Sequence, residues 1–214
     1  MRVGILGTGD VGRALGKGFI ELGHEVTMGS RDPKNEKMAA WVREGGAGAS
    51  GGSFAEAAEF GELIVLATLG VANAEVIRQA GPERFRGKVI IDATNPLDFS
   101  KGMPPTLAVG HSDSGGEQVQ RLLPEALVVK AFNTVGHAHM VRPDFPGGPP
   151  DMFLCGNDEA AKRKVAGICR DFGWGVIDLG GIESSRYLEP MCMVWVIHGA
   201  RTGSWNHGFK MLRR

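Results

Sequence analysis

The chain has 214 residues, of which 43% are hydrophobic and 22% charged. This composition excludes a disordered or fibrous protein and is typical of a globular chain that buries a substantial core. Lysine plus arginine equal aspartate plus glutamate at 24 each, so no overall charge favours nucleic acid as a partner. No apolar run reaches the roughly 18 residues of a membrane span, and MRVGILG does not resemble a signal peptide. We expect a cytoplasmic protein without a membrane or nucleic-acid partner.

The first thirty residues predict a strand, a tight turn, a helix and a second strand. Residues 2–6 form a short apolar run that ends at Gly7, and helical periodicity begins near Asp10 and continues to Leu22. Gly23 then provides a helix stop, and residues 24–28 alternate between polar and apolar side chains. These features predict one complete βαβ unit.

Two helix caps can be predicted in the next segment. Asp32 precedes Pro33, which indicates an N-cap and a helix that runs to about Glu44. Ser53 is expected to cap a short helix over residues 54–59. Between them, the glycine-rich stretch GGAGASGG predicts a loop that contains one short strand.

The βα alternation continues through the rest of the chain. In order, the expected elements are a strand at 63–68, a helix at 72–79, a strand at 88–92, a helix at 116–123, strands at 126–131 and 152–155, a helix at 159–172, a strand at 175–179 and a mostly helical segment at 184–212. Apolar strands that alternate with helices predict a doubly wound, mostly parallel sheet of the Rossmann type in an α/β protein. We expect an NADP-binding domain at 1–140 and a small C-terminal α+β lobe at 141–214, packed on the same sheet.

A glycine motif marks the expected cofactor site. Gly7, Thr8, Gly9, Asp10, Val11 and Gly12 match the pattern G-x-G-x-x-G, after a predicted strand and at the start of a predicted helix. In this context the first glycine makes the turn, the second admits a pyrophosphate, and the third lets the helix approach the strand. The amide groups and the dipole of the helix start would bind the negative charge. The motif predicts a dinucleotide site.

The end of the second predicted strand favours NADP(H) over NAD. An NAD-binding chain usually has an acidic residue there to bind the ribose hydroxyls, whereas this chain has Gly29, Ser30 and Arg31. The guanidinium of Arg31 suits a 2′-phosphate, Ser30 adds a hydroxyl donor, and Lys34 or Lys37 adds a second cation.

Several blocks together resemble the coenzyme F420-dependent NADP oxidoreductases. They are GILGTGDVGRALGKGF, GSRDP, DATNPL at 92–97, VKAFNT at 129–134 and LEP at 188–190. The N-terminal domains of membrane metalloreductases, which pass electrons from NADPH to flavin, are similar to the same family. The resemblance implies a dimeric oxidoreductase in which the nicotinamide stacks on coenzyme F420 or a flavin as the second substrate.

The resemblance also implies site residues at matching positions. Thr8, Gly9, Asp10 and Val11 would line the pyrophosphate, and Ser30 and Arg31 would hold the 2′-phosphate. Thr68 and Leu69 would flank the nicotinamide ribose, while Asn95 and Ala131 would border the nicotinamide. This chain departs from the family at Leu69-Gly70-Val71, where a proline often follows the threonine, and in the residues Trp195, His198, Trp205 and His207.

No catalytic residue or metal ligand is predicted. Direct hydride transfer between stacked rings needs alignment rather than an acid or base. His137 and His139 lack a third ligand partner, Asp92 and Asp98 are expected to be structural, and Cys155, Cys169 and Cys192 are expected to be buried thiols.

Two alternatives remain open. An NADPH-dependent imine, ketone or 3-hydroxy acid reductase would need a proton donor, for which Lys130 is the lysine to test. A non-catalytic NADPH-binding redox sensor would bind the cofactor without oxidising it. A homodimer is expected from the apolar segment 191–197, which one chain is too small to cover.

Overall fold

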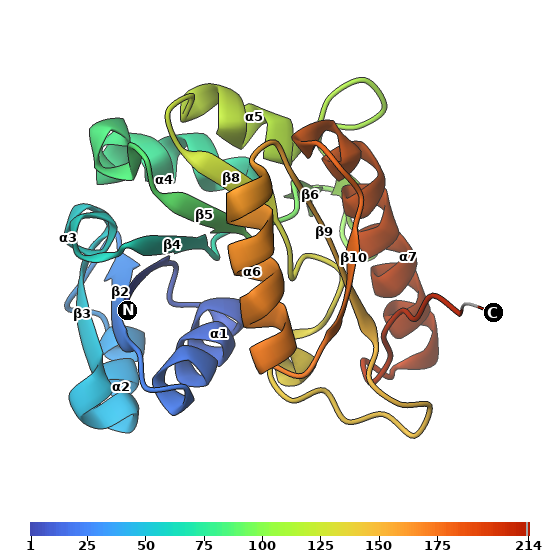
Figure 1. Ribbon diagram of the computed structural model, residues 1–214, viewed down its shortest axis with the longest axis horizontal. Helices are drawn as coiled ribbons and strands as arrows, with labels where there is room; N and C mark the ends of the chain where they lie inside the picture. The colour runs from blue at the N-terminus through green and yellow to red at the C-terminus, as the bar shows by residue number, and fades with distance from the viewer. Residues whose placement is uncertain (213) are drawn as a thin grey trace.

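The computed structural model describes residues 1–212 and 214, and within them eight strands form one twisted sheet (Figure 1). The strand order is β10-β9-β8-β5-β4-β1-β2-β3. The bounds are β1 (Arg2–Leu6), β2 (Glu25–Ser30), β3 (Ala49–Ser53), β4 (Leu63–Leu66), β5 (Val89–Asp92), β8 (Leu127–Lys130), β9 (Asp151–Gly156) and β10 (Gly175–Asp178). Neighbouring strands are parallel except β8 and β9, which are antiparallel. The predicted Rossmann-type, mostly parallel sheet is confirmed.

Helices cover both faces of the sheet and bury a separate apolar layer on each. On one face, α1 (Asp10–Glu21), α2 (Glu36–Gly45) and α6 (Glu159–Asp171) enclose a core that includes Phe19 and Trp41. Helices α3 (Phe54–Phe60), α4 (Asn73–Ala80), α5 (Gly115–Leu122) and α7 (Ser185–Thr202) contribute to the other core, which includes Phe85 and Leu188. Burial on both faces explains why the central strands are continuous apolar runs rather than alternating ones.

Short 3₁₀ turns connect several of these elements. They are η1 (Gly46–Gly48), η2 (Gly70–Ala72), η3 (Pro82–Phe85), η4 (His137–His139) and η5 (Ile182–Ser184). Of these, η2 follows β4 and η4 follows β8, so both lie in loops beyond the carboxyl ends of parallel strands. Ligands of open α/β sheets bind at this edge.

One predicted helix cap is confirmed and the other is wrong. The Ser53 hydroxyl accepts a hydrogen bond from the Glu56 backbone N–H at 3.2 Å, and Glu56 accepts one from the Ser53 N–H, so the pair forms a capping box for α3. Helix α2, however, begins at Glu36 and is capped by Asn35, not by Asp32. Asp32 instead accepts from the Lys34 N–H at 3.0 Å, which makes a local turn that delays the helix start.

The C-terminal segment is mostly helical, as predicted, but the helix ends before the segment does. Helix α7 ends at Thr202 because Gly203 takes a left-handed conformation with φ of 67°. The described residues beyond it are not helical, and Trp195 holds them to α7 by donating from its ring N–H to the His207 carbonyl at 2.9 Å. Strands β9 and β10 extend the same sheet. The division into an NADP-binding domain at 1–140 and a C-terminal lobe at 141–214 therefore stays a prediction.

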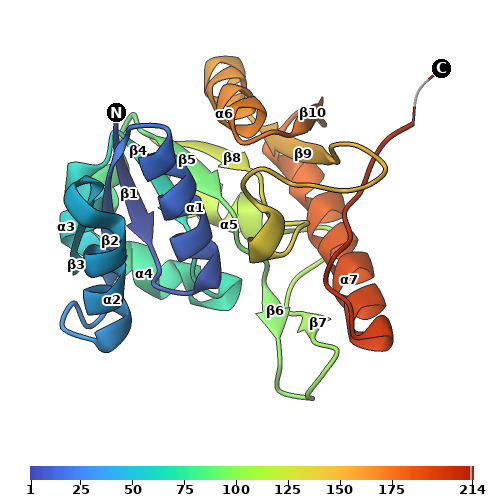
Figure 2. The same cartoon turned by 90° about the horizontal axis from the view of Figure 1, so that it is seen from below.

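A two-stranded arm was not predicted from the sequence. Strands β6 (Leu97–Asp98) and β7 (Thr106–Leu107) are antiparallel and carry a loop that projects from the body of the protein (Figure 2). The loop contains Phe99 and Met103, both exposed. The arm begins directly after Pro96, so it borders the carboxyl end of β5.

Two further predictions can be compared with the fold. Cys155, Cys169 and Cys192 are buried free thiols, as expected. Within residues 1–212 and 214, no helix is both long enough and apolar enough to cross a bilayer.

Candidate functional site

The glycine loop joins β1 to α1 with the backbone geometry that a dinucleotide site requires. Gly7 has φ of 130°, and a Cβ placed on it would lie 2.4 Å from the Ala67 carbonyl oxygen. A Cβ on Gly12 would lie 2.2 Å from the Gly7 carbonyl oxygen. These two positions therefore accept only glycine, one for the turn and one for the contact between helix and strand.

Gly9 differs from the other two glycines because the space beside it is open. A Cβ on Gly9 would meet no described atom within 4 Å. Gly9 is also the N-cap of α1, and no side chain of the described residues caps that helix. The first amide groups of α1 thus face an open region in which an anion can approach the backbone, so the loop fits a pyrophosphate.

A cationic group lies at the carboxyl end of β2, next to the glycine loop. The Gly7 N–H donates to the Gly29 carbonyl at 3.0 Å, which joins the glycine loop to the end of β2. Arg31 and Lys34 are exposed and form no ion pair with any described residue. The Ser30 hydroxyl accepts from Asn35 Nδ2 at 3.0 Å, which leaves its own hydrogen available to a ligand. This end of β2 can therefore receive a phosphate monoester.

The loops after β4 and β5 are joined directly. The Gly70 N–H donates to the Asn95 carbonyl at 3.1 Å, and a Cβ on Gly70 would lie 2.3 Å from the same oxygen. The departure from the family pattern at Leu69-Gly70-Val71 therefore allows a close approach between two loops. Leu69 itself is 60% exposed, and Thr68 is half-buried with its methyl group beside Gly7.

The loops after β5 and β8 are joined by two asparagines. Asn95 Nδ2 donates to the Asn133 carbonyl at 2.8 Å, and Asn133 Nδ2 donates to Asn95 Oδ1 at 3.0 Å. A third bond, from Asn133 Nδ2 to the Leu188 carbonyl at 3.0 Å, holds α7 against these loops. Ala131, directly after β8, is fully buried. The residues expected around the nicotinamide thus lie in adjacent loops, although contact with a cofactor stays a prediction.

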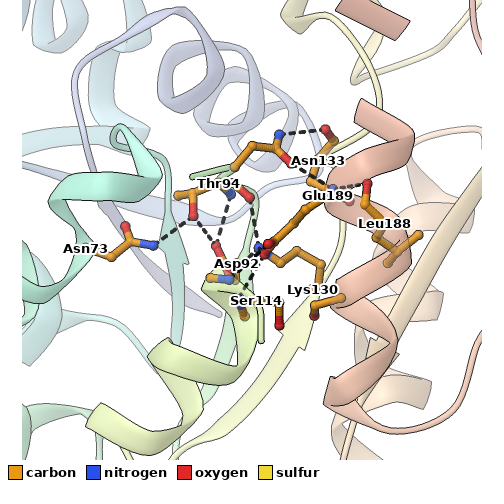
Figure 3. A network of polar contacts seen from close by, with 12 residues as sticks. Asn73, Asp92, Thr94, Ser114, Lys130, Asn133, Leu188 and Glu189 are labelled. Atoms are coloured by element: carbon orange, nitrogen blue, oxygen red, sulfur yellow. Dashed lines mark hydrogen bonds and ion pairs between the residues drawn. The ribbon is translucent and has the colours of Figure 1, made fainter. Parts of the chain in front are cut away.

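A buried ionic cluster lies beneath this edge of the sheet (Figure 3). The ammonium of Lys130, at the end of β8, lies 2.7 Å from Asp92 Oδ2 and 2.8 Å from Glu189 Oε1, and all three side chains are at most 1% exposed. The third N–H of Lys130 donates to the Thr94 carbonyl at 2.9 Å. The ammonium is therefore surrounded by three oxygen atoms, two of them from carboxylates, and this pairing offsets the cost of burying its charge.

Glu189 also caps α5. Its two carboxylate oxygens accept from the backbone N–H groups of Gly115 and Gly116, each at 2.9 Å. The cluster contains two carboxylates and one ammonium, and the positive end of the α5 dipole offsets the remaining negative charge. Glu189 belongs to the LEP block, whose role the sequence alone did not reveal.

These contacts make Lys130 unsuited to donate a proton to a substrate. Burial by itself would lower the pKa of Lys130, but the charges of Asp92 and Glu189 and its hydrogen bonds to them outweigh burial and raise the pKa above its usual value. A proton donor needs access to substrate and a pKa near the working pH. Lys130 has neither, so the residue proposed for an imine or ketone reductase is a structural ion-pair partner.

The polar network also includes residues that sequence reasoning missed. Asn73 lies at the start of α4 and Thr94 follows β5, and both are buried. Polar residues after a buried strand were a usable signal for Thr94, since such strand ends line ligand sites. Asn73 had no comparable signal, because its bond to Thr94 joins residues that are 21 positions apart.

Comparison with known proteins agrees with this geometry. Residues 2–96 match the family described as NADP oxidoreductase coenzyme F420-dependent. The F420-dependent NADP reductase of Methanocaldococcus jannaschii is 32% identical over 201 residues, covering 89% of each chain. A crystal structure from Arthrobacter sp. FB24, provisionally assigned as an F420-dependent NADP-reductase, superposes with a TM-score of 0.95 at 42% identity and covers 100% of both chains.

More distant similarities extend to larger proteins. The metalloreductase STEAP3 of Rattus norvegicus is 29% identical over 193 residues, which cover 89% of this chain and 36% of that protein. The chain therefore spans about a third of that relative's length. An imine reductase of Streptomyces aurantiacus shares the fold with a TM-score of 0.65 at 18% identity, covering 96% of this chain and 64% of that one.

The Rossmann sheet, the open glycine loop and the cationic end of β2 define an NADP(H)-dependent oxidoreductase. The 32% sequence identity to the Methanocaldococcus jannaschii reductase, over 89% of each chain, narrows this class to one family. The chain belongs to the family of coenzyme F420-dependent NADP oxidoreductases.

Proposed function

We propose that this protein transfers a hydride between NADP(H) and coenzyme F420. The observation that carries the proposal is the similarity to F420-dependent NADP reductases over nearly the whole chain. It is supported by the burial of Lys130, the lysine of the polar network, which cannot reach a substrate. A deazaflavin ring accepts the hydride at carbon, and the proton that neutralises the reduced ring can come from water, so an accessible acid of the protein is not required.

Each loop of the edge has a role in the proposal. Gly7, Thr8, Gly9, Asp10, Val11 and Gly12 would surround the pyrophosphate, and Ser30, Arg31 and Lys34 would bind the 2′-phosphate. Thr68 and Leu69 would flank the nicotinamide ribose, and Asn95 with Ala131 would border the nicotinamide. Because Ala131 is fully buried, it would act as the floor beneath Asn95 and Asn133 rather than as an exposed contact.

Positioning is the main contribution of the protein to the reaction. Two rings that stack with the reacting carbons aligned convert a bimolecular step into one between pre-oriented groups. The two hydrogen bonds between Asn95 and Asn133 and the bond from Gly70 to Asn95 hold the three loops in register. The side chains of Leu69 and of the neighbouring Val71, both exposed, offer apolar surface to a second ring.

We also propose that the protein is a cytoplasmic homodimer. Helix α7 presents Tyr187, Val194 and Ile197 to solvent, at spacings of about two and one helical turns on one face. An apolar stripe of this kind is typical of an interface. Sedimentation equilibrium tests the dimer, and a monomer at all concentrations would contradict it.

Stopped-flow oxidation of NADPH tests the function. Purified protein is mixed with NADPH or NADH and with F420, FMN or a small cyclic imine as acceptor. Rapid, NADPH-selective reduction of F420 is expected. Rapid reduction of FMN alone would reassign the acceptor to a flavin, turnover of the imine alone would indicate an imine reductase, and tight NADPH binding without turnover of any acceptor would indicate a sensor.

A further inference from the structure

The polar network beneath the cofactor edge has a direction, because several of its members can only donate or only accept. Lys130 is donor-only and Asp92, as a carboxylate, is acceptor-only. Asp92 Oδ1 accepts from the Thr94 hydroxyl at 2.6 Å and from the Thr94 N–H at 3.0 Å. The single hydroxyl hydrogen of Thr94 is therefore committed to Asp92.

This commitment fixes the next member, Asn73. With its hydrogen used, Thr94 Oγ1 can only accept, and it accepts from Asn73 Nδ2 at 2.8 Å. The amide of Asn73 must then turn its oxygen toward Thr68. Thr68 donates its hydroxyl hydrogen to Asn73 Oδ1 at 3.2 Å.

The Thr68 hydroxyl, which is the last group in this series of hydrogen bonds, therefore has no hydrogen left to donate. Thr68 Oγ1 can only accept a further hydrogen bond. Asn73, Thr94 and Asp92 are at most 4% exposed, so water does not compete for the bonds among them, and the Asn73 amide keeps its oxygen toward Thr68. Thr68 itself is half-buried and lies beside Gly7, at the border of the glycine loop.

We propose that this buried chain of hydrogen bonds fixes the Thr68 hydroxyl as an acceptor for the nicotinamide riboside half of NADP(H). That half offers ribose hydroxyl and carboxamide N–H donors, whereas the neighbouring pyrophosphate offers only acceptors. Thr68 thus favours the riboside and disfavours a phosphate at its position. Asn73 and Thr94 are positioning residues, because they act on the cofactor through Thr68.

Lys130 and Glu189 anchor the far end of the same chain. Lys130 holds the Asp92 carboxylate and the Thr94 carbonyl, and Glu189 holds Lys130 from α7. The inference rests on the proposed placement of the nicotinamide riboside at Thr68 and not on the identity of the hydride acceptor.

Equilibrium binding to two ligands tests the proposal without any acceptor. The ligands are NADPH and adenosine 2′,5′-bisphosphate, which lacks the nicotinamide riboside. Thr68→Val should weaken NADPH binding about 3- to 10-fold, the loss of one hydrogen bond, while binding of the bisphosphate stays within about 2-fold. Thr68→Ser should retain NADPH affinity, and Thr202→Val, at the exposed end of α7, serves as the matched control.

A double-mutant cycle tests the directional chain itself. Asn73→Leu releases the Thr68 hydrogen and should weaken NADPH binding, but it should add nothing once Thr68 is valine, because the two changes remove one interaction. Unchanged NADPH affinity in Thr68→Val, equal losses for both ligands, or additive losses in the double variant would overturn the proposal. If Asn73→Leu does not fold, the comparison of Thr68→Val with Thr68→Ser still tests the proposal. If the variants bind NADPH and the bisphosphate as predicted but the protein does not reduce F420, the proposed function is contradicted and the role of Thr68 is not.

Discussion

The ammonium of Lys130 lies 2.8 Å from Glu189 Oε1, and the same carboxylate caps α5 through the N–H groups of Gly115 and Gly116. One buried contact thus connects β8, α5 and α7. Gly116 is needed for this approach, since a Cβ there would lie 2.4 Å from Ser185 Oγ and 3.1 Å from Lys130 Cε. The C-terminal helix is in this way fixed to the carboxyl edge of the sheet.

Removal of the Lys130 charge should destabilise the protein strongly. Lys130→Met leaves Asp92 and Glu189 buried without their cation, for which a loss of about 3–5 kcal/mol in the free energy of unfolding is expected. Lys162→Met is the matched control, because Lys162 is also buried but its partners Glu159 and Asp178 are 69% and 44% exposed. Water can solvate those carboxylates, so a loss of at most about 1 kcal/mol is expected. Denaturant unfolding measures both, and equal losses would contradict the role given to the buried cluster.

Glycine substitutions should separate cofactor binding from folding. Gly9→Ala places a methyl group in open space, so stability should change by less than about 1 kcal/mol while NADPH binding falls at least about 10-fold as the pyrophosphate is displaced. Gly12→Ala forces a contact with the Gly7 carbonyl and should destabilise the fold itself. Thermal unfolding and NADPH titration of the two variants test this, and a Gly9→Ala variant with full affinity would place the pyrophosphate elsewhere.

Arg31 should set the preference for NADP(H). A charge-assisted bond to the 2′-phosphate contributes about 1.5–3 kcal/mol, so Arg31→Ser should reduce the preference for NADPH over NADH by about 10- to 100-fold. Affinity for NADH should change little, since NADH lacks that phosphate. Arg43→Ser, on the exposed side of α2, controls for the loss of a cation. An unchanged preference would assign the 2′-phosphate to other cations.

The rate of hydride transfer should be independent of Lys130 ionisation near neutral pH. The folded-state pKa of Lys130 is raised above its ordinary 10.5 by its carboxylate partners. The ion pair therefore contributes its full stabilisation below that value and loses it only as the pH rises through the higher folded-state pKa. Single-turnover rates between about pH 6 and about pH 9 should show no step from a lysine. A rate that falls as a lysine deprotonates in this window would restore Lys130 as a proton donor.

Local sequence patterns predicted the features that depend on neighbouring residues. Composition and spacing within the first twenty residues predicted the strand at 2–6, the glycine turn and the helix from Asp10. The Ser53 cap likewise depends only on its near neighbours. The cap of α2 was misplaced because Asp32 and Asn35 are both good caps, and the local turn at Asp32 decides between them. The arm was missed because its strands have two residues each and flank a proline-containing loop.

The tertiary part of the site was beyond sequence reasoning. Lys130 and Glu189 are 59 positions apart, and nothing in VKAFNT or LEP indicates that they form an ion pair. The same holds for Asn73 and Thr94, which are 21 positions apart. The motifs indicated which segments belong to the site, but the side-chain contacts between those segments depend on the fold.

Transfer of a hydrogen label tests the central claim most directly. NADPH carrying deuterium at the transferable position of nicotinamide C4 is oxidised by the protein with F420 in ordinary water, and the reduced deazaflavin is analysed by mass spectrometry. We expect one deuterium per reduced molecule, carried from carbon to carbon without exchange. Unlabelled product, or no reduced deazaflavin while another acceptor is consumed, would contradict direct hydride transfer between NADP(H) and coenzyme F420.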